Sequence, residues 1–184
     1  MNLFELSRSQ LVSVIRDQTP TRFNSRLKIQ LGTGLKLDPD LLVRSGLLNV
    51  KVPVVGETDE YLVSIEIDDY LRDLVYSVQR SVPSERRNTI VQSLRYAFQM
   101  YDMKVHCTCP DFHYRFEYTA NQKGALVIPP GDANILPAKI TNPDNNGVGC
   151  KHIGYVVANY SRWVPKLVTQ LNRTLKNNPS LLSR

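Results

Sequence analysis

The sequence predicts an α+β fold, a small sheet with flanking helices. Apolar and polar residues alternate from Leu48 to Ile67 around a polar turn at residues 56–60, which is typical of a β-hairpin. From Tyr70 to Tyr101 apolar residues instead recur every three or four positions, as on amphipathic helices. A chain of 184 residues has room for one domain with its own core and a small attached module.

Three elements are expected before the hairpin. Apolar residues at near-helical spacing predict a helix from Phe4 to Asp17, which ends before Thr19-Pro20 because the proline disfavours helix in the preceding residue. Period-two alternation from Arg26 to Leu31 predicts a strand. The sequence Asp38-Pro39-Asp40 indicates the start of a short helix.

Further elements are expected after the hairpin. The apolar stripes predict one helix from Tyr70 to Val82 and a second that opens at Ser84 as its cap. Met103 to His106 reads as a short strand, and Ile153 to Tyr160 as a helix. A last helix is expected from Pro165, because proline suits the first helical position.

Composition limits the class of protein. No stretch approaches the ~20 apolar residues that cross a bilayer, so we expect a soluble protein with no membrane partner. The first six residues lack the basic start and long apolar run of a secretory signal, so secretion by a signal peptide is not expected. Three cysteines are an odd number for disulfides, and in a reducing compartment they are more often metal ligands or catalytic groups.

The spacing of the cysteines predicts one structural zinc site. Cys107 and Cys109 form a C-x-C pair, and Cys150 and His152 form a C-x-H pair some forty residues later, which leaves no cysteine over. Three thiolates and one imidazole make a closed tetrahedral zinc site with no open position for water. Pro110 would stiffen the exit from the first pair.

Other readings of these residues remain open. The three cysteines could be buried only for packing, and His106 or His113 could replace His152 as the fourth ligand. Catalysis by a Cys150–His152 nucleophile and base is disfavoured, because no carboxylate is placed to orient the histidine. We therefore expect a protein that is not an enzyme.

The ligand pattern, with a strand before the first pair and a helix after the second, resembles the SWIM-type zinc finger. This resemblance implies a zinc-stabilised ββα-like module, here with a long irregular insert, that serves DNA binding or protein interaction. Residues 109–118 and the segment from Asn142 to His152 are similar to SWIM-like proteins of tailed bacteriophages. That similarity implies a viral protein, located in the host cytoplasm or the virion.

The insert between the two ligand pairs is expected to form an irregular arm. It holds four prolines between Gly124 and Asn146, and irregular arms of this kind often bind a partner. Asp111 is expected to cap a short helix that carries aromatic residues, which either build a small core or stack on bases. We divide the chain into an N-terminal α+β region at 1–102, the zinc module at 103–163 and a basic helix and tail at 164–184.

Two functions follow from these patterns. In the first, zinc holds the module rigid so that the arm and the last helix dock on protein neighbours, as in a structural or assembly component of a tailed phage; the oligomeric state stays open. In the second, the net charge of +6 serves DNA binding. The basic residues that would contact phosphates are Lys151, Arg162, Lys166, Arg173 and Lys176. We also expect the metal to stabilise the module alone, because the N-terminal half carries most of the long apolar stripes.

Overall fold

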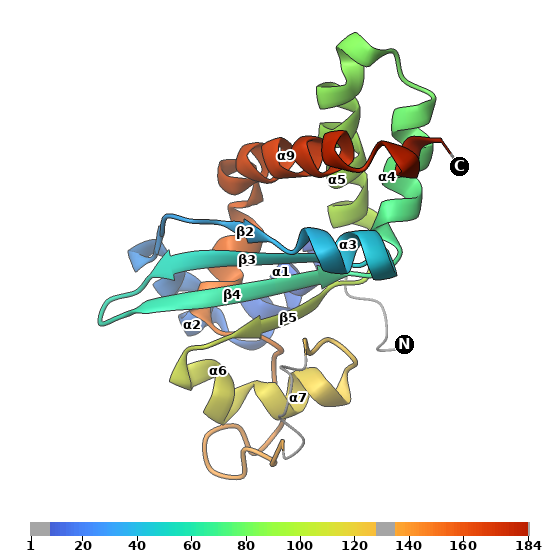
Figure 1. Ribbon diagram of the computed structural model, residues 1–184. Coiled ribbons are helices and arrows are strands. Elements are labelled where there is room, and N and C mark those ends of the chain that lie inside the picture. The colour runs from blue at the N-terminus through green and yellow to red at the C-terminus, as the bar shows by residue number, and fades with distance from the viewer. Residues whose placement is uncertain (1–7, 128–134, 184) are drawn as a thin grey trace.

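The chain forms an α+β fold built on one small antiparallel sheet with flanking helices (Figure 1). The computed structural model describes residues 8–127 and 135–183. Its α-helices are α1 (Arg8–Gln18), α2 (Pro20–Ser25), α3 (Pro39–Ser45), α4 (Tyr70–Gln79), α5 (Arg86–Met100), α6 (Pro110–Arg115), α7 (Glu117–Gln122), α8 (Lys151–Ala158) and α9 (Tyr160–Asn177). Its strands are β1 (Gln30–Leu31), β2 (Lys36–Leu37), β3 (Leu48–Val55), β4 (Glu60–Ile67) and β5 (Lys104–Cys107). Short 3-10 helices are η1 (Arg26–Lys28), η2 (Pro83–Glu85) and η3 (Pro179–Leu182).

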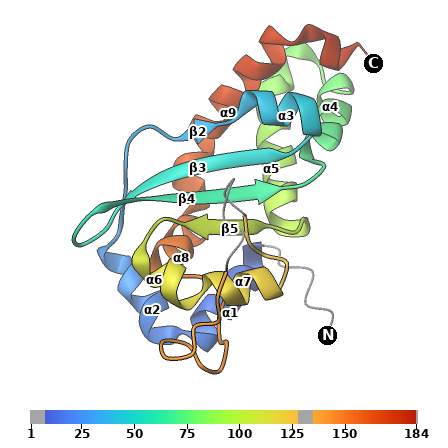
Figure 2. The same ribbon diagram turned by 60° about the horizontal axis from the view of Figure 1, so that its bottom comes forward.

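The hairpin of β3 and β4 is the centre of the sheet, as the alternating pattern predicts. The two strands pair from Leu48 opposite Ile67 to Val55 opposite Glu60. β1 and β2 both pair with the other edge of β3, near its two ends, and β5 pairs with β4. The apolar residues of these strands belong to one hydrophobic cluster that extends from α1 to α9. Within this cluster α8 packs against β3, β4 and β5, and α1 packs against α8 (Figures 1 and 2).

The hydrophobic cluster includes side chains from all three of the regions into which we divide the chain. Leu11 of α1, Phe112 of α6 and Leu171 of α9 are all fully buried in it. α9 continues past the sheet to pack against α5, and η3 packs against α4. None of the helices in the described part of the chain combines the length and the apolarity needed to cross a membrane.

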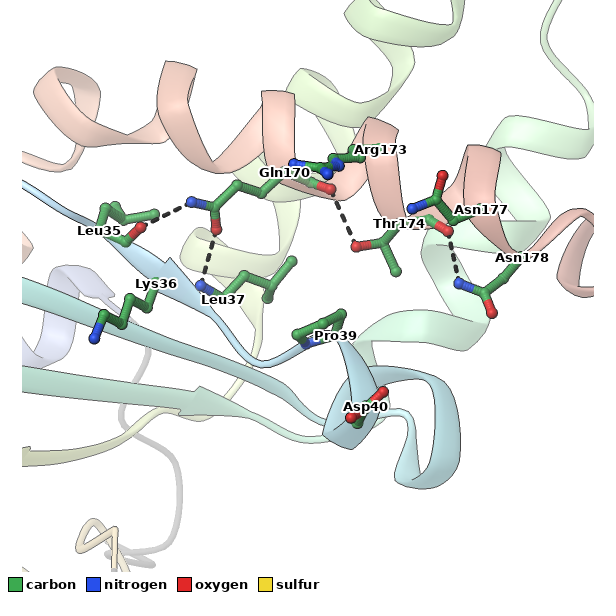
Figure 3. A pocket seen from close by; sticks show the side chains of 10 residues that line it. All are labelled: Leu35, Lys36, Leu37, Pro39, Asp40, Gln170, Arg173, Thr174, Asn177 and Asn178. Carbon is green, nitrogen blue, oxygen red and sulfur yellow. Dashed lines mark hydrogen bonds between the residues drawn. The ribbon is translucent and has the colours of Figure 1, made fainter.

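The side chain of Gln170 joins α9 to the outer edge of β2 (Figure 3). Its Oε1 accepts a hydrogen bond from the N–H of Leu37 at 2.8 Å, and its Nε2 donates to the carbonyl of Leu35 at 2.8 Å. An edge strand otherwise presents unpaired backbone groups. The glutamine therefore completes the edge as a neighbouring strand would, and it fixes the position of α9 over the sheet.

The predicted strand from Arg26 to Leu31 is wrong over most of its length. A 3-10 turn occupies residues 26–28, and only Gln30 and Leu31 form a strand. The Arg26 guanidinium lies 3.5 Å from the centre of the Phe23 ring and donates to the Phe23 carbonyl at 2.6 Å. These contacts continue the helical path of α2, so Leu27 points into solvent and is 80% exposed.

Several predicted helix starts also differ from the structure. Ser84 lies inside η2, which leads into α5, and Pro165 lies inside α9 rather than at its start. α9 begins five residues earlier, where Trp163 donates from Nε1 to the Val156 carbonyl at 3.0 Å and anchors the helix on α8. The first helix is present as α1 from Arg8, while the predicted start at Phe4 lies outside the described residues.

Replacing Gln170 with leucine should destabilise the protein by about 1–2 kcal/mol, because Leu35 and Leu37 lose backbone partners at an edge that water reaches only in part. Urea unfolding would measure the loss, and hydrogen exchange should accelerate at the Leu37 amide. Gln99→Leu is the matched control, since Gln99 is an exposed glutamine on α5. Equal midpoints for the two variants would show that the edge contact contributes nothing.

Candidate metal centre

The first pair of candidate ligands lies where the sheet meets α6. Cys107 is the last residue of β5 and pairs with Val63 of β4. Thr108 ties the following turn to β4, because its N–H donates to the Leu62 carbonyl at 3.1 Å and its Oγ1 accepts from the Leu62 N–H at 3.0 Å. Cys109 then begins α6, with its Sγ accepting from the Phe112 N–H at 3.3 Å. The expected cap, Asp111, is instead in the first turn, because Cys109 holds the cap position.

The second pair lies at the N-terminus of α8. Cys150 is the N-cap of this helix, and His152 is in its first turn. The approach to Cys150 is close to α1: Gly147 has a φ of 75° and donates its N–H to Gln18 Oε1 at 2.6 Å. A Cβ on Gly149 would come within 2.9 Å of Ile15 Cδ1, so a larger residue would push the ligand pair away from α1. Helix α1 thus sets the position of the second pair.

The four predicted ligands converge on one point. One donor atom from each of Cys107, Cys109, Cys150 and His152 lies within 4.8 Å of the others, and each residue is 2% exposed or less. The Sγ of Cys150 is 3.8 Å from Nδ1 of His152. A tetrahedral ion with bonds of about 2.0–2.3 Å separates its donors by roughly 3.5–3.8 Å, so the observed spacing fits. The cluster could hold a metal ion.

The ring of His152 presents Nδ1 to the sulfur atoms and Nε2 to the sheet. Nε2 is buried and has no hydrogen-bond partner among the described residues. It faces the β3–β4 turn, where a Cβ added to Gly56 would lie 3.1 Å from it, and the imidazole packs against the Tyr61 ring at 4.6 Å between centres. The geometry therefore assigns Nδ1 as the donor toward the cluster.

The competing histidines lie outside the cluster. His106 points to the opposite face of β5 from Cys107, and its Nε2 is 3.8 Å from Oε1 of Glu117. His113 places Nδ1 2.7 Å from Oε2 of the same carboxylate, one helical turn earlier. Glu117 is 4% exposed and was not singled out by the sequence patterns, although the i,i+4 spacing from His113 is visible in them.

The protonation of the thiols depends on burial. Burial raises the pKa of Cys107 and of Cys150, whereas hydrogen bonds with these two side chains lower the pKa of Cys109. Three buried thiolates side by side would repel one another without a cation. A metal ion at this point would therefore displace protons from the sulfur atoms when it binds.

An acidic residue that sequence patterns did not identify joins the second ligand pair to the sheet. Glu57, in the β3–β4 turn, accepts from Lys151 Nζ at 2.7 Å and from Lys28 Nζ at 2.8 Å. Hydrogen bonds from Lys151 and Lys28 lower the pKa of the Glu57 carboxyl to about 2. Glu57 is therefore ionised at neutral pH and restrains the residue between Cys150 and His152.

The structure does not gather the five basic residues of the DNA-binding hypothesis into one surface. Lys151 is paired with Glu57, and its side chain is only 18% exposed. Arg162 approaches the Tyr155 hydroxyl at 3.5 Å from the start of α9. Lys166, Arg173 and Lys176 are exposed further along α9 and have no ion pair with another described residue.

The insert divides between core and surface. Phe112 and Phe116 are fully buried in the hydrophobic cluster that also includes the three cysteines, whereas Tyr114 is 66% exposed. Asn142 holds the arm against α6, because its Nδ2 donates to the Arg115 carbonyl at 3.0 Å. The same Nδ2 donates to the Asn146 carbonyl at 2.9 Å, which joins two parts of the arm. The expectation of a small core is thus confirmed for Phe112 and Phe116, whereas stacking of the exposed Tyr114 on bases stays a prediction.

Comparison with known proteins adds no relative. No protein-family model matches the chain, and neither the curated proteins nor the solved structures contain a significant match. The site is therefore characterised by its own geometry.

Replacing His152 with alanine should lower metal affinity by more than about 100-fold, since losing even an outer partner of a ligand costs 10–100-fold. The hydrophobic cluster is continuous, so we now expect the thermal midpoint to fall for the whole chain in a single transition rather than for the module alone. Competition with a chelator and calorimetry would measure the two effects.

His113→Ala is the control for this experiment, because His113 lies one turn from Cys109 but contacts Glu117 instead of the cluster. Its metal affinity should equal that of the unmodified protein. An equal loss in both variants would contradict the assigned ligand set, and two separate thermal transitions would restore the module as an independent unit.

Proposed function

We propose that this chain is a non-enzymatic, zinc-stabilised binding protein that docks on protein neighbours. The observation that carries the proposal is the convergence of three cysteines and one histidine on one buried point. A set of three sulfur donors and one nitrogen donor favours zinc over the harder cations, which prefer oxygen. Four protein donors fill a tetrahedron and leave no position for a substrate or an activated water.

The resemblance to SWIM-type zinc fingers supports this proposal. Strand β5 runs into the first ligand pair and ends at Cys107, and helix α8 is capped by Cys150 and contains His152. Assembly in a tailed bacteriophage is proposed from the resemblance of the insert to SWIM-like phage proteins. In this role the metal holds the insert in place, and the insert contacts the neighbour.

The exposed side chains of the insert support docking on protein. Leu136 is 79% exposed, Ile140 is 93% exposed and Tyr114, whose carbonyl accepts from the Oγ1 of Thr141, is 66% exposed. Large apolar side chains that gather on a surface are typical of interaction sites. The contacts of Asn142 hold this surface to α6, so it is ordered before a partner arrives.

Cobalt substitution would test the closed, structural character of the site. The Co²⁺-loaded protein should show sulfur-to-metal charge-transfer bands and a tetrahedral visible spectrum that azide or cyanide does not change. A spectrum that shifts with added azide would reveal an open coordination position, and the non-enzymatic proposal would fail. The Cys107→Ser variant, which lacks one sulfur donor, is the control for the charge-transfer bands.

DNA binding is the second candidate, favoured by one observation. Lys36 of β2 lies directly opposite Lys51 of β3, and like charges at such a pair repel. A surface hollow of about 580 Å³ lies between β2 and α9, and its charged lining residues are Lys36, Asp40 and Arg173 (Figure 3). Of the five basic residues that the sequence suggested for phosphate contact, only Arg173 lines this hollow.

Charge reversal would decide between the two candidates. Lys36→Glu together with Arg173→Glu should weaken retention of duplex DNA and reduce its salt dependence if phosphates bind here, because each lost contact removes about one unit of the salt slope. Lys139→Glu, on the insert, is the matched control. Absence of retention by the unmodified protein at low salt would remove the DNA candidate.

A further inference from the structure

Seven of the eight large apolar side chains that the described residues expose lie at two ends of the molecule, and the eighth, Leu27, lies in η1. Four of them, the hairpin patch, lie on the α4–α5 hairpin: Tyr76, Val82, Tyr96 and Met100. Three others, the arm patch, lie on α6 and the arm: Tyr114, Leu136 and Ile140. The α4–α5 hairpin and the arm project from opposite ends of the protein in both views (Figures 1 and 2). Neither patch can therefore cover the other within one chain.

The hairpin patch borders a groove between α4 and α5. The groove has a volume of about 560 Å³, within the range of ligand pockets, and Tyr76 and Tyr96 stand at its sides. Tyr70 forms its floor, and the buried Tyr70 hydroxyl lies near Ser93 without reaching hydrogen-bond geometry with any described residue. Asp73 is the only charged side chain among its described lining residues, and its Oδ1 also accepts from the Nε of Arg72, outside the lining, at 3.3 Å. The groove thus offers aromatic walls and one carboxylate, which Arg72 already contacts from outside the groove.

The arm patch is built on a short helical turn. The N–H of Asn142 donates to the Ala138 carbonyl at 2.9 Å, which closes a helical turn over residues 138–142. This turn follows Leu136 and carries Ile140, the most exposed large apolar residue of the described chain. Lys139 is exposed in the same turn and has no ion pair among the described residues. The turn therefore presents the aliphatic side chains of Leu136 and Ile140 together with the positive charge of Lys139.

We propose that the arm patch of one copy docks in the α4–α5 groove of a second copy, so that the protein associates head to tail. Leu136 and Ile140 enter between Tyr76 and Tyr96, and Lys139 approaches Asp73. A contact between two different surfaces leaves one groove and one arm free at the ends of each pair, so association continues into a ring or an open filament. The proposal deepens and rests on the proposed docking function, since it names the partner as a second copy.

The arrangement also has a physical advantage. Asn142 holds the arm by three hydrogen bonds to backbone groups, so docking immobilises few additional side chains and loses little conformational entropy. Both patches are small compared with the interface of a stable dimer, so the association should be weak and should depend on protein concentration.

Sedimentation velocity on the metal-loaded full chain would test the proposal with two variants. The arm variant combines Leu136→Asp with Ile140→Asp, and the groove variant combines Tyr76→Glu with Tyr96→Glu. All four positions are more than half exposed, so the fold should tolerate the changes. Leu27→Asp, at an 80% exposed position away from both patches, is the matched control.

The unmodified protein and the Leu27→Asp control should form species larger than a dimer as concentration rises. Each of the two variants alone should remain monomeric. A mixture of the two should give a one-to-one dimer that grows no further, because the arm variant keeps its groove and the groove variant keeps its arm.

Three results would overturn the proposal. The unmodified protein could stay monomeric up to about 1 mM, which would assign both patches to other proteins. Either variant could associate as the unmodified protein does, or the mixture could remain monomeric. The cobalt spectrum reports on the metal site alone, so a failure of self-association is distinguishable from a failure of the closed zinc site.

Discussion

The convergence of Cys107, Cys109, Cys150 and His152 is the constraint on which the rest of the structure depends. The first two residues belong to the sheet and the turn that follows it, and the last two open the buried helix α8. An ion at this point would crosslink a sheet edge to a central helix across an insert of forty residues. Because three buried thiolates would repel one another without a cation, binding of an ion at this point would be coupled to loss of the thiol protons and to folding of the core.

The surroundings of the cluster show how the fold positions it. Helix α1 supports the second ligand pair through Ile15 and Gln18, and the β3–β4 turn reaches it through Glu57. These elements come from the first third of the chain, while the ligands come from the second half. The four candidate ligands therefore lie within a shared core, and loss of a bound ion should affect the structure beyond the insert.

The insert presents exposed side chains on a segment that the core holds in place. Phe112 and Phe116 pack into the hydrophobic core, and Asn142 ties the arm to the end of α6. Leu136 and Ile140 are consequently held outward on an ordered turn, away from the α4–α5 hairpin at the opposite end. The molecule is thus asymmetric, with the arm patch at one end and the α4–α5 groove at the other. Both proposals for its partners follow from that asymmetry.

The sequence by itself determined the α+β class, the central hairpin and the four candidate ligands, because local alternation and ligand spacing encode each of them directly. It could not place the strand at 26–31 or the start of α9, since contacts of Arg26 with Phe23 and of Trp163 with Val156 overrode the local pattern. The sequence also did not predict the roles of Glu57, Glu117 and Gln170, because each of them contacts partners that the fold brings close to it. Only the tertiary structure decided which exposed residues share a surface, since exposure depends on what the rest of the chain covers.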